Sequence, residues 1–336
     1  MAIPSPRNSR RVTLTDIAAA CGVAPSTVSR ALSNPNRVSP AMYERIVRKA
    51  RDMGYRSAAL TDDRDRMARG SVALVLPNLS NPFNLDVIRG SQAQAQAAGY
   101  LHLLVSTEES VHVETTWLGE LSRTVDGVVL ASPRADDAVI RDMADNVPLV
   151  VLNREIEGLT GVLIDTPSGL AQSLDYLVSL GHRRIAYVRG PASSWSDRAR
   201  FAALTGAAEA HGADLIPVGS FQPSLASGAA AADAVALTPA TAAIFFNDTL
   251  AIGALQRFRR LGIAVPGRMS VVGCDDIFGA SFAHPPLTTV TSPGERAGRD
   301  VTDLLIGRLA TRDRGHRVDR IAAHLSVRES TGPAPG

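Results

Sequence analysis

The stretch Thr13–Ser33, TLTDIAAACGVAPSTVSRALS, carries the signals of two short helices separated by a tight turn. Thr13 suits an N-cap, and Asp16 stands at the third helical position as a weak form of the capping box. Gly22 supplies a left-handed residue that ends the first helix. Pro25 fits the first turn of the second helix, because its missing N–H would have no partner there. The stretch therefore predicts a helix-turn-helix.

The second predicted helix has an apolar and a polar face. Val28 and Leu32 fall on the apolar face. The outward residues are short or rich in hydrogen-bond donors: Ser26, Thr27, Ser29 and Arg30. A third helix is predicted to open at Ser39-Pro40 and to run to Gly54. The polar face fits the major groove of DNA, and the alternative is an ordinary three-helix bundle with incidental basic residues.

Positive charge is concentrated at the start of the chain. The 336 residues carry a net charge of +2, but residues 1–70 hold 13 Lys and Arg against six Asp and Glu. This segment therefore carries +7 and the remainder −5, a division typical of a module that meets phosphates. Lys49 is the only lysine, which excludes a Walker-A loop and a Schiff-base lysine elsewhere.

Residues 13–55, TLTDIAAACGVAPSTVSRALSNPNRVSPAMYERIVRKARDMGY, resemble the DNA-binding head of the LacI/GalR family of regulators. The resemblance implies base contacts from Pro25, Ser26 and Arg30, with Arg30 as the strongest. It implies phosphate contacts from Thr15, Thr27, Ser29 and Ser39. The full set of predicted DNA-contacting residues is Thr13, Leu14, Thr15, Pro25, Ser26, Thr27, Ser29, Arg30, Arg37 and Ser39.

The segment after this head departs from the family. Where members have a hinge helix with a Pro-Asn pair and a leucine that enters the minor groove, this chain reads RSAALTDDRDR from Arg56 to Arg66. Its acidic residues would repel phosphates. Residues 57–70 are predicted to be a linker that acts as a solvated tether and bends DNA little. The alternative is a shifted hinge with Leu60 or Met67 as the wedge.

From Ser71 onward, short apolar runs alternate with longer amphipathic segments. The runs SVALVLP, YLHLLV, DGVVLA and VPLVVLN are followed by a second series in RRIAYVRG, the region before Phe221, TAAIFFND and MSVVGCDD. Such alternation predicts an α/β core of parallel sheets covered on both faces. The repetition predicts two lobes, divided near Asp165, with crossing connections near Pro285 to Val290. Ligands of such sheets bind at the carboxyl ends of the strands, here in the cleft between the lobes.

The core is also similar to the periplasmic-binding-protein-like core of the same family. Five short tags in order carry this likeness: Asn81-Pro82-Phe83, Gly181 to Ile185, Phe246-Asn247-Asp248, Gly273 to Asp276, and Pro286 to Val290. With the head, the resemblance covers nearly the whole chain. It implies a transcription regulator, expected to be a repressor, whose DNA binding a small molecule controls.

Strand-end residues suggest the chemistry of that molecule. Asp275 accepts hydrogen bonds from hydroxyls, Asn247 both donates and accepts, and Arg200 offers a planar fork of donors, which together suit a sugar or similar polyol. Aromatic side chains and further polar groups are added to these three residues. The full set of predicted effector contacts is Asn81, Phe83, Trp195, Arg198, Arg200, Phe221, Asn247 and Asp275. Two alternatives stay open: Asn81-Pro82-Phe83 as a mere helix start, and Arg198 as an inter-lobe ion pair.

Other polar residues are assigned structural roles. Asp248 and Asp276 are expected to cap helices, His182 to close a helix at a turn, and Cys21 and Cys274 to be small core residues. The sequence holds no serine elbow, HExxH motif or cysteine cluster. We therefore expect no catalytic residue, metal or cofactor. The rival classes are a periplasmic sugar-binding protein, which needs no helix-turn-helix, and a sugar-modifying enzyme, which needs a base or nucleophile in the cleft.

The predicted organisation is a flexible basic N-terminus at 1–11, a DNA-binding domain at 12–56, the linker at 57–70, a core for effector binding and dimerisation at 71–329, and a flexible tail at 330–336. The expected partners are double-stranded operator DNA, a small-molecule effector and a second copy of the chain, without a membrane. Because RESTGPAPG after Val327 lacks leucine heptads, a dimer is expected rather than a tetramer. No secretory or membrane segment is recognised, so a cytoplasmic protein, nucleoid-associated on its operator, is expected.

Overall fold

The computed structural model describes residues 12–33, 38–53, 70–311 and 315–336. The chain divides into two compact units, Met1–Arg69 and Gly70–Gly336, which are called the head and the core. The predicted residues 1–11 and nearly all of the linker at 57–70 lie outside the described residues. None of the described helices is both long and apolar enough to cross a membrane.

The head contains three helices, α1 (Leu14–Cys21), α2 (Pro25–Ser33) and α3 (Pro40–Asp52). The predicted caps of α1 are confirmed: Thr13 and Asp16 form the capping box, and Gly22 is left-handed with φ 63°. Ile17, Val28 and Ile46 are fully buried, one from each helix, and hold the three together. The helix-turn-helix predicted from the sequence is therefore present.

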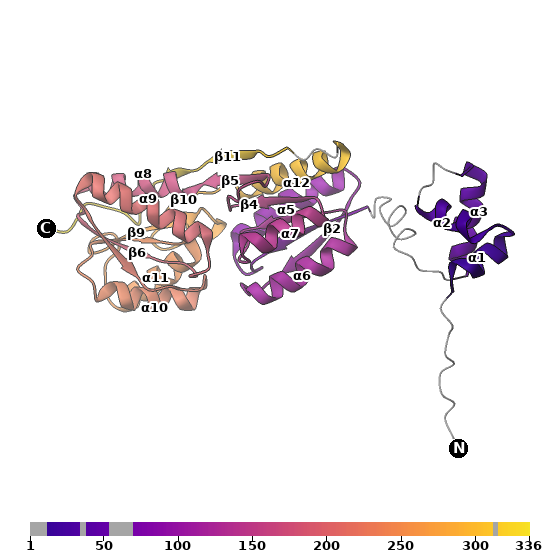
Figure 1. Cartoon of the computed structure of the whole chain (residues 1–336). Coiled ribbons are helices and arrows are strands. Elements are labelled where there is room, and N and C mark those ends of the chain that lie inside the picture. The colour runs from indigo at the N-terminus through magenta and orange to yellow at the C-terminus, as the bar shows by residue number, and fades with distance from the viewer. Residues whose placement is uncertain (1–11, 34–37, 54–69, 312–314) are drawn as a thin grey trace, which may run out of the picture. The chain divides into compact units, whose positions relative to one another are not determined.

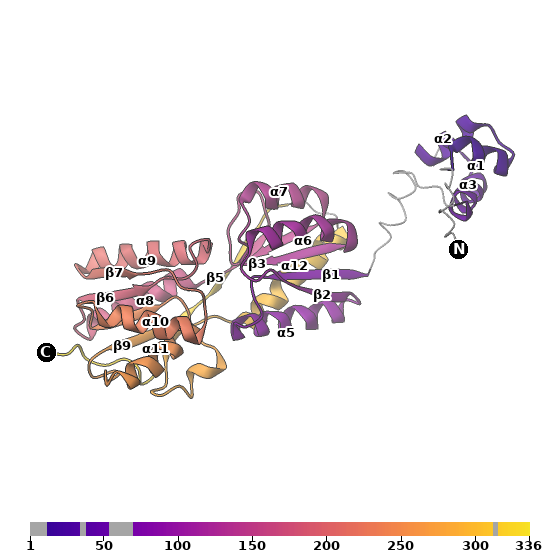
Figure 2. The same cartoon turned by 90° about the horizontal axis from the view of Figure 1, so that it is seen from below.

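The first lobe of the core is built on a six-stranded sheet in the order β11-β5-β4-β3-β1-β2, in which all neighbours are parallel. Its strands are β1 (Ser71–Leu76), β2 (Leu101–Ser106), β3 (Gly127–Ala131), β4 (Leu149–Leu152), β5 (Gly161–Asp165) and β11 (Val318–Ala322). Its helices are α5 (Pro82–Ala97), α6 (Val111–Thr124), α7 (Asp137–Asn146) and α12 (Gly294–Thr311). Figure 2 shows α6 and α7 on one side of the sheet and α5 on the other, where α12 packs against it.

The second lobe repeats this plan in the order β12-β10-β9-β8-β6-β7, with only β12 antiparallel to its neighbour. Its strands are β6 (Arg184–Val188), β7 (Asp214–Val218), β8 (Ala242–Phe245), β9 (Ser270–Asp275), β10 (Thr288–Thr291) and β12 (His324–Ser326). Its helices are α8 (Thr166–Ser179), α9 (Trp195–His211), α10 (Leu225–Ala236), α11 (Asp248–Arg260) and the short η2 (Phe278–Ala280). In Figure 1, α8 and α9 cover one face of this sheet, and α10 and α11 cover the other.

The eight strands predicted from apolar runs are all present. Strands β1, β3, β4 and β8 are buried at every position, and apart from Ser71 and Gly127 their residues are apolar. The chain passes from the first sheet to the second after Asp165. The crossing predicted near Pro285 to Val290 is displaced, because β10 still pairs with β9 and the return follows Thr291. A third crossing joins β11 to β12.

The expectation of a flexible tail at 330–336 is wrong for most of that segment. Ser330 is buried, and its hydroxyl donates to the Val271 carbonyl at 2.6 Å. The N–H of Ala334 donates to the Leu180 carbonyl at 2.9 Å. His182, which closes α8 as predicted, is itself buried and lies 3.1 Å from the Gly332 carbonyl through Nε2. Small residues let this segment lie close to the second lobe, although their composition is also typical of mobile tails.

Candidate functional site

The second helix of the head presents the polar face that the sequence predicts. Pro25, Ser26, Ser29 and Arg30 are exposed and Thr27 is half-buried, whereas Val28 is fully buried on the opposite side. A surface of short hydroxyls with one long guanidinium leaves room for a base edge to approach the helix. The geometry of α2 is thus compatible with a recognition helix.

The remaining predicted DNA contacts lie at helix starts. Thr13, Thr15 and Ser39 are exposed, while Leu14 is half-buried and packs against the head core. The free N–H groups and positive dipole of a helix N-terminus favour phosphate oxygens, so these positions suit backbone contacts. Arg37 lies outside the described residues.

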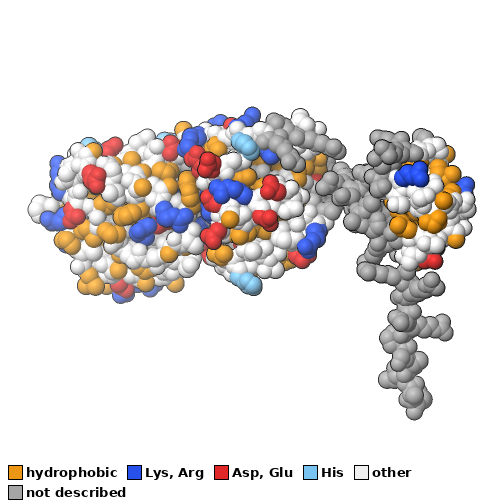
Figure 3. Space-filling view, in the orientation of Figure 1, with side chains coloured by type: hydrophobic (Ala, Val, Ile, Leu, Met, Phe, Trp, Pro, Cys, Tyr) orange, Lys and Arg blue, Asp and Glu red, His pale blue; other side chains and the backbone are white. Residues whose placement is uncertain are grey.

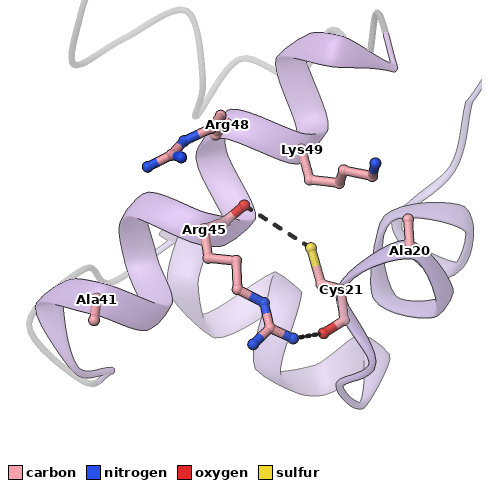
Figure 4. A pocket seen from close by; sticks show the side chains of 6 residues that line it. All are labelled: Ala20, Cys21, Ala41, Arg45, Arg48 and Lys49. Atoms are coloured by element: carbon pink, nitrogen blue, oxygen red, sulfur yellow. Dashed lines mark hydrogen bonds between the residues drawn. The ribbon is translucent and has the colours of Figure 1, made fainter.

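A cavity of about 350 Å³ lies on the head between α1 and α3. Its lining residues are Ala20, Cys21, Ala41, Arg45, Arg48 and Lys49 (Figure 4). Arg45 donates a hydrogen bond to the Cys21 carbonyl and so caps the end of α1, while Arg48 and Lys49 point away from each other. The three cations do not converge on one point, and we assign no ligand to this cavity.

The cleft between the two lobes lies where the parallel strands of both sheets end. Its lining combines asparagines, serines, two phenyl rings and four charged groups: Pro77, Asn78, Asn81, Phe83, Asn84, Glu109, Ser132, Arg134, Asn153, Ser194, Ser196, Arg200, Pro223, Phe246 and Asp275. The enclosed space is about 50 Å³, whereas ligand pockets typically measure roughly 300–1,000 Å³. A sugar-sized ligand therefore needs the lining side chains or the lobes to move apart.

The first-lobe wall of the cleft is held by one buried ion pair. Arg134 follows β3 and donates through Nε to Glu109 at 2.8 Å, and both side chains are largely buried. Asn78 donates to the other oxygen of Glu109 at 2.7 Å. The Arg134 guanidinium also donates to the Ser132 carbonyl at 2.9 Å. These bonds fix the loops after β1, β2 and β3 relative to one another.

The second-lobe wall contains Arg200 and Asp275. Arg200, in α9, donates to the Phe246 carbonyl at 2.7 Å and to the Thr166 hydroxyl at 3.1 Å. Its third nitrogen lies 3.6 Å from the Asp275 carboxylate, and its guanidinium lies over the Phe246 ring. All three guanidinium nitrogens therefore have partners within the second lobe.

The Asp275 carboxyl is buried, and burial raises its pKa to about 6 although Arg200 and a hydrogen bond from Asn81 lower it. Asn81 is at the start of α5 in the first lobe, so this bond joins the two walls. A second bond across the cleft runs from the Ser196 hydroxyl to the Asn153 carbonyl at 3.2 Å. Polar groups of the closed cleft thus satisfy one another.

Backbone strain is concentrated in this lining. Of the six described non-glycine residues with positive φ, four line the cleft: Glu109 (61°), Ser132 (46°), Asn153 (59°) and Asp275 (116°). Asn and Asp tolerate this region, but Glu109 and Ser132 are uncommon there. Such conformations persist where surrounding structure enforces them, and they cluster at ligand sites.

Four of the eight predicted effector contacts line the cleft, namely Asn81, Phe83, Arg200 and Asp275. Trp195, Arg198, Phe221 and Asn247 are not part of the lining. Arg198 is exposed and donates to the Ala192 carbonyl at 3.5 Å, and it forms no inter-lobe ion pair with any residue that the structure describes. Phe221 packs against Gly219 and the second-lobe core.

Asn247 caps a helix, the role that the sequence analysis expected for its neighbour Asp248. Its side chain caps α11 by accepting from the Leu250 N–H at 3.1 Å, and its buried Nδ2 has no partner among the described residues. Asp248 instead joins β9 to β10, since it accepts from the Ile277 N–H at 2.9 Å and the Thr289 hydroxyl at 2.5 Å. It also lies so close to Gly273 that a Cβ there would meet its carboxylate at 2.1 Å.

Asp276 likewise caps no helix. It accepts from Arg328 at 2.6 Å and from the Thr291 hydroxyl at 3.1 Å. The capping predicted for Asp248 and Asp276 is therefore wrong, because tertiary partners compete successfully for both carboxylates.

Sequence reasoning missed several lining residues. Asn78, Glu109, Arg134 and Asn153 come from loops that follow different strands, and only the fold brings these loops together. Ser196 had a local signal, because it precedes Arg200 by four residues and shares its helix face. Phe246 lies within a quoted tag but was not selected.

A helix-turn-helix head and a two-lobed core with a polar cleft define a transcription regulator that binds a small molecule. Two family models match: "Bacterial regulatory proteins, lacI family" over residues 13–57 and "Periplasmic binding protein-like domain" over residues 174–331. The HTH-type transcriptional repressor CytR of Escherichia coli (strain K12) is 30% identical over 332 residues, covering 96% of this chain and 97% of CytR. The chain belongs to the LacI family of bacterial regulatory proteins.

Other relatives agree with this assignment. The HTH-type transcriptional regulator DegA of Bacillus subtilis (strain 168) is 31% identical, covering 96% of this chain and 99% of DegA. The solved complex of the transcriptional regulator CelR with cellobiose has a TM-score of 0.71 and 29% identity, covering 95% of this chain and all of that one. The lac repressor dimer bound to operator and the anti-inducer ONPF, at 23% identity, a TM-score of 0.71 and coverage of 96% and 100%, shows the same fold.

Proposed function

We propose that this protein is a repressor whose operator binding is controlled by a sugar or sugar derivative held in the cleft between the lobes. The observation that carries this proposal is the convergence of Asp275, Arg200 and Asn81 on one space at the strand ends of both sheets. Carboxylate, guanidinium and amide groups together match paired hydroxyls. The related CelR binds cellobiose in its solved complex, which is consistent with such a ligand.

Residues 12–56 would bind DNA and residues 71–329 would bind the effector and a second copy of the chain. The protein would act in the cytoplasm, at the nucleoid when bound. Because lobe movement in a dimer changes the spacing of two heads, ligand and DNA would affect each other's binding reciprocally, by typically 1–3 kcal/mol.

Exposed apolar residues support the homodimer. The edge strand β2 leaves Leu101 70%, Leu103 39% and Leu104 42% exposed, and in the second lobe Phe278 and Phe282 are about 70% exposed with ring centroids 5.6 Å apart. Unpaired edges and exposed apolar patches of this kind mark interfaces. Figure 3 shows acidic, basic and hydrophobic side chains interspersed on one face of the core. Leu101→Asp combined with Phe282→Asp should give a monomer in sedimentation velocity, and a dimer that persists would contradict this interface.

The first experiment is a thermal-shift panel of monosaccharides, disaccharides, sugar acids, sugar phosphates and nucleosides. A ligand at 100 times its Kd adds about 2.7 kcal/mol to the free energy of unfolding, which is readily detected. A hit that disappears in Asp275→Ala would support both the ligand class and the cleft. Silence across the panel would contradict a sugar effector.

Binding to DNA is tested separately through Arg30. Arg30→Ala should weaken binding to a selected operator by about 1–3 kcal/mol, because it removes a base contact, and should leave non-specific binding largely intact. Gel shifts on operator and on random DNA measure both quantities. An equal loss on both would make Arg30 a phosphate contact instead.

A further inference from the structure

Four charged residues line the cleft, and they form two separate pairs. Arg134 is bound to Glu109 in the first lobe, and Arg200 is next to Asp275 in the second. The lining therefore carries as many carboxylates as guanidinium groups. Each pair is contained within its own lobe, so opening and closing the cleft does not separate the charges.

Neutral partners also use part of each guanidinium group. Arg200 donates to the Phe246 carbonyl and the Thr166 hydroxyl, and Arg134 donates to the Ser132 carbonyl. An incoming phosphate or carboxylate would meet guanidinium groups whose charge is already balanced by a carboxylate of the same lobe. A buried anion without a free cation is costly, since its lost hydration is not replaced.

The uncharged lining offers what a neutral ligand needs. Asn81, Asn153, Ser194 and Ser196 supply amide and hydroxyl groups from both lobes, and Phe83 and Phe246 supply one phenyl ring from each. Amides and hydroxyls exchange hydrogen bonds with ligand hydroxyls, and rings pack against the apolar face of a sugar.

We infer that the cleft selects uncharged, hydroxyl-rich effectors and rejects their phosphorylated or carboxylate derivatives, because both cleft arginines are neutralised inside their own lobes. This inference rests on the proposed function and narrows it to one class of ligand. On this inference the cleft binds a free sugar or nucleoside more tightly than a sugar phosphate, a sugar acid or a nucleotide.

The test uses pairs in which one member carries an anionic group that the other lacks: D-ribose and D-ribose 5-phosphate, cellobiose and cellobionate, adenosine and adenosine 5′-monophosphate. Isothermal titration of the full chain at pH 8 keeps Asp275 ionised. In every pair with a binding member, the neutral compound should bind at least tenfold more tightly. A charged member that binds equally or more tightly overturns the inference and leaves the proposed function standing. No binding in any pair overturns the proposed sugar effector and the inference with it.

A charge-switch variant tests the cause of this selectivity. Glu109→Gln keeps the shape of the side chain but leaves the Arg134 charge without its carboxylate, so preference within the pairs should move toward the charged member by tenfold or more. Glu155→Gln is the matched control, because Glu155 forms an ion pair with Arg320 on the first-lobe surface and does not line the cleft. Asp275→Asn should move the preference in the same direction from the second lobe. An unchanged preference in both cleft variants would show that the ion pairs do not set it.

Discussion

In the first lobe the Arg134 guanidinium is 2.8 Å from Glu109, whereas in the second lobe Arg200 is 3.6 Å from Asp275. Glu109 also accepts a hydrogen bond from Asn78 of its own lobe. Asp275 interacts with Asn81, which belongs to the opposite lobe, as well as with Cys274 and Ser292 of its own lobe. The two lobes thus use the same types of groups but direct their carboxylates differently.

We call the first-lobe side of the cleft, where the charged pair has a structural role, the wall. We call the second-lobe side, where the ligand would bind, the receptor. The Glu109 carboxylate is occupied by partners that stay with it when the cleft opens, so it fixes the shape of the first lobe. Opening separates Asp275 from Asn81, and burial is the main cause of its raised pKa of about 6. A ligand hydroxyl that donates to Asp275 replaces the lost bond, which places ligand recognition mainly in the second lobe.

The largest expected effect is that of Arg200→Ala. Removing one member of a buried charged pair in a binding site typically costs about 2–5 kcal/mol, so the response to the effector should be abolished while DNA binding is kept. Titration calorimetry and gel shifts with and without effector measure these two properties. Arg198→Ala is the control, since Arg198 lies on the same helix but is exposed and outside the lining.

Arg134→Ala is the first-lobe counterpart of Arg200→Ala, and it tests whether the two arginines have different roles. Arg134→Ala should lower the free energy of unfolding by about 3–5 kcal/mol, because Glu109 would stay buried without its partner. If the chain remains folded, affinity for a neutral effector should fall less than in Arg200→Ala. The reverse order of affinities would contradict the assignment of wall and receptor.

A second difference between the lobes concerns their buried structural carboxyls. Burial raises the pKa of Asp248 in the second lobe to about 8, and it raises the pKa of Glu114 in the first lobe, where N–H groups of Ala135 and Arg134 oppose it. A raised pKa means that the folded chain binds the proton more tightly than the unfolded chain. Stability is therefore lost as the pH rises from about 4 through the folded pKa.

Asp248→Asn should remove this pH dependence. Between pH 5.5 and 8 the free energy of unfolding of the variant should rise relative to the parent chain by up to about 1.4 kcal/mol per pH unit. Urea unfolding at several pH values provides the measurement, with Glu114→Gln as the first-lobe counterpart. Parallel pH profiles for the parent chain and Asp248→Asn would show that Asp248 is ionised throughout.

The sequence identified the charged pair of the second lobe but not that of the first. Asp275 ends a strand and Arg200 lies on a helix with a family likeness, so local pattern and resemblance both identified them. Arg134 and Glu109 are 25 residues apart in loops, and their pairing depends on β1 lying between β2 and β3. Hydrophobic periodicity predicts strands but does not give the order in which they pair.

Side-chain direction explains the remaining errors at the site. Trp195 and Arg198 are close to Arg200 in sequence, but only a spacing of three or four residues keeps side chains on one helix face, and Ser196 has the better spacing. The caps were misassigned because Asn247 and Asp248 are equally good cap residues by type. Only the position of the Thr289 hydroxyl and the Ile277 N–H decides between them.

The smallest expected effect concerns a hydrogen bond that joins the two lobes. The Ser196 hydroxyl donates to the Asn153 carbonyl across the cleft, and such a bond contributes about 0.5–1.5 kcal/mol. If the bond is kept when a ligand is enclosed, Ser196→Ala makes closure less favourable and should weaken effector affinity about two- to tenfold. Thr205→Ala, which removes a hydroxyl that bonds within α9 to the Phe201 carbonyl, is the matched control and should leave affinity unchanged. Tighter binding in Ser196→Ala would mean that a ligand must break this bond, and the Asn153 carbonyl would then belong with Asp275 among the groups that a ligand displaces.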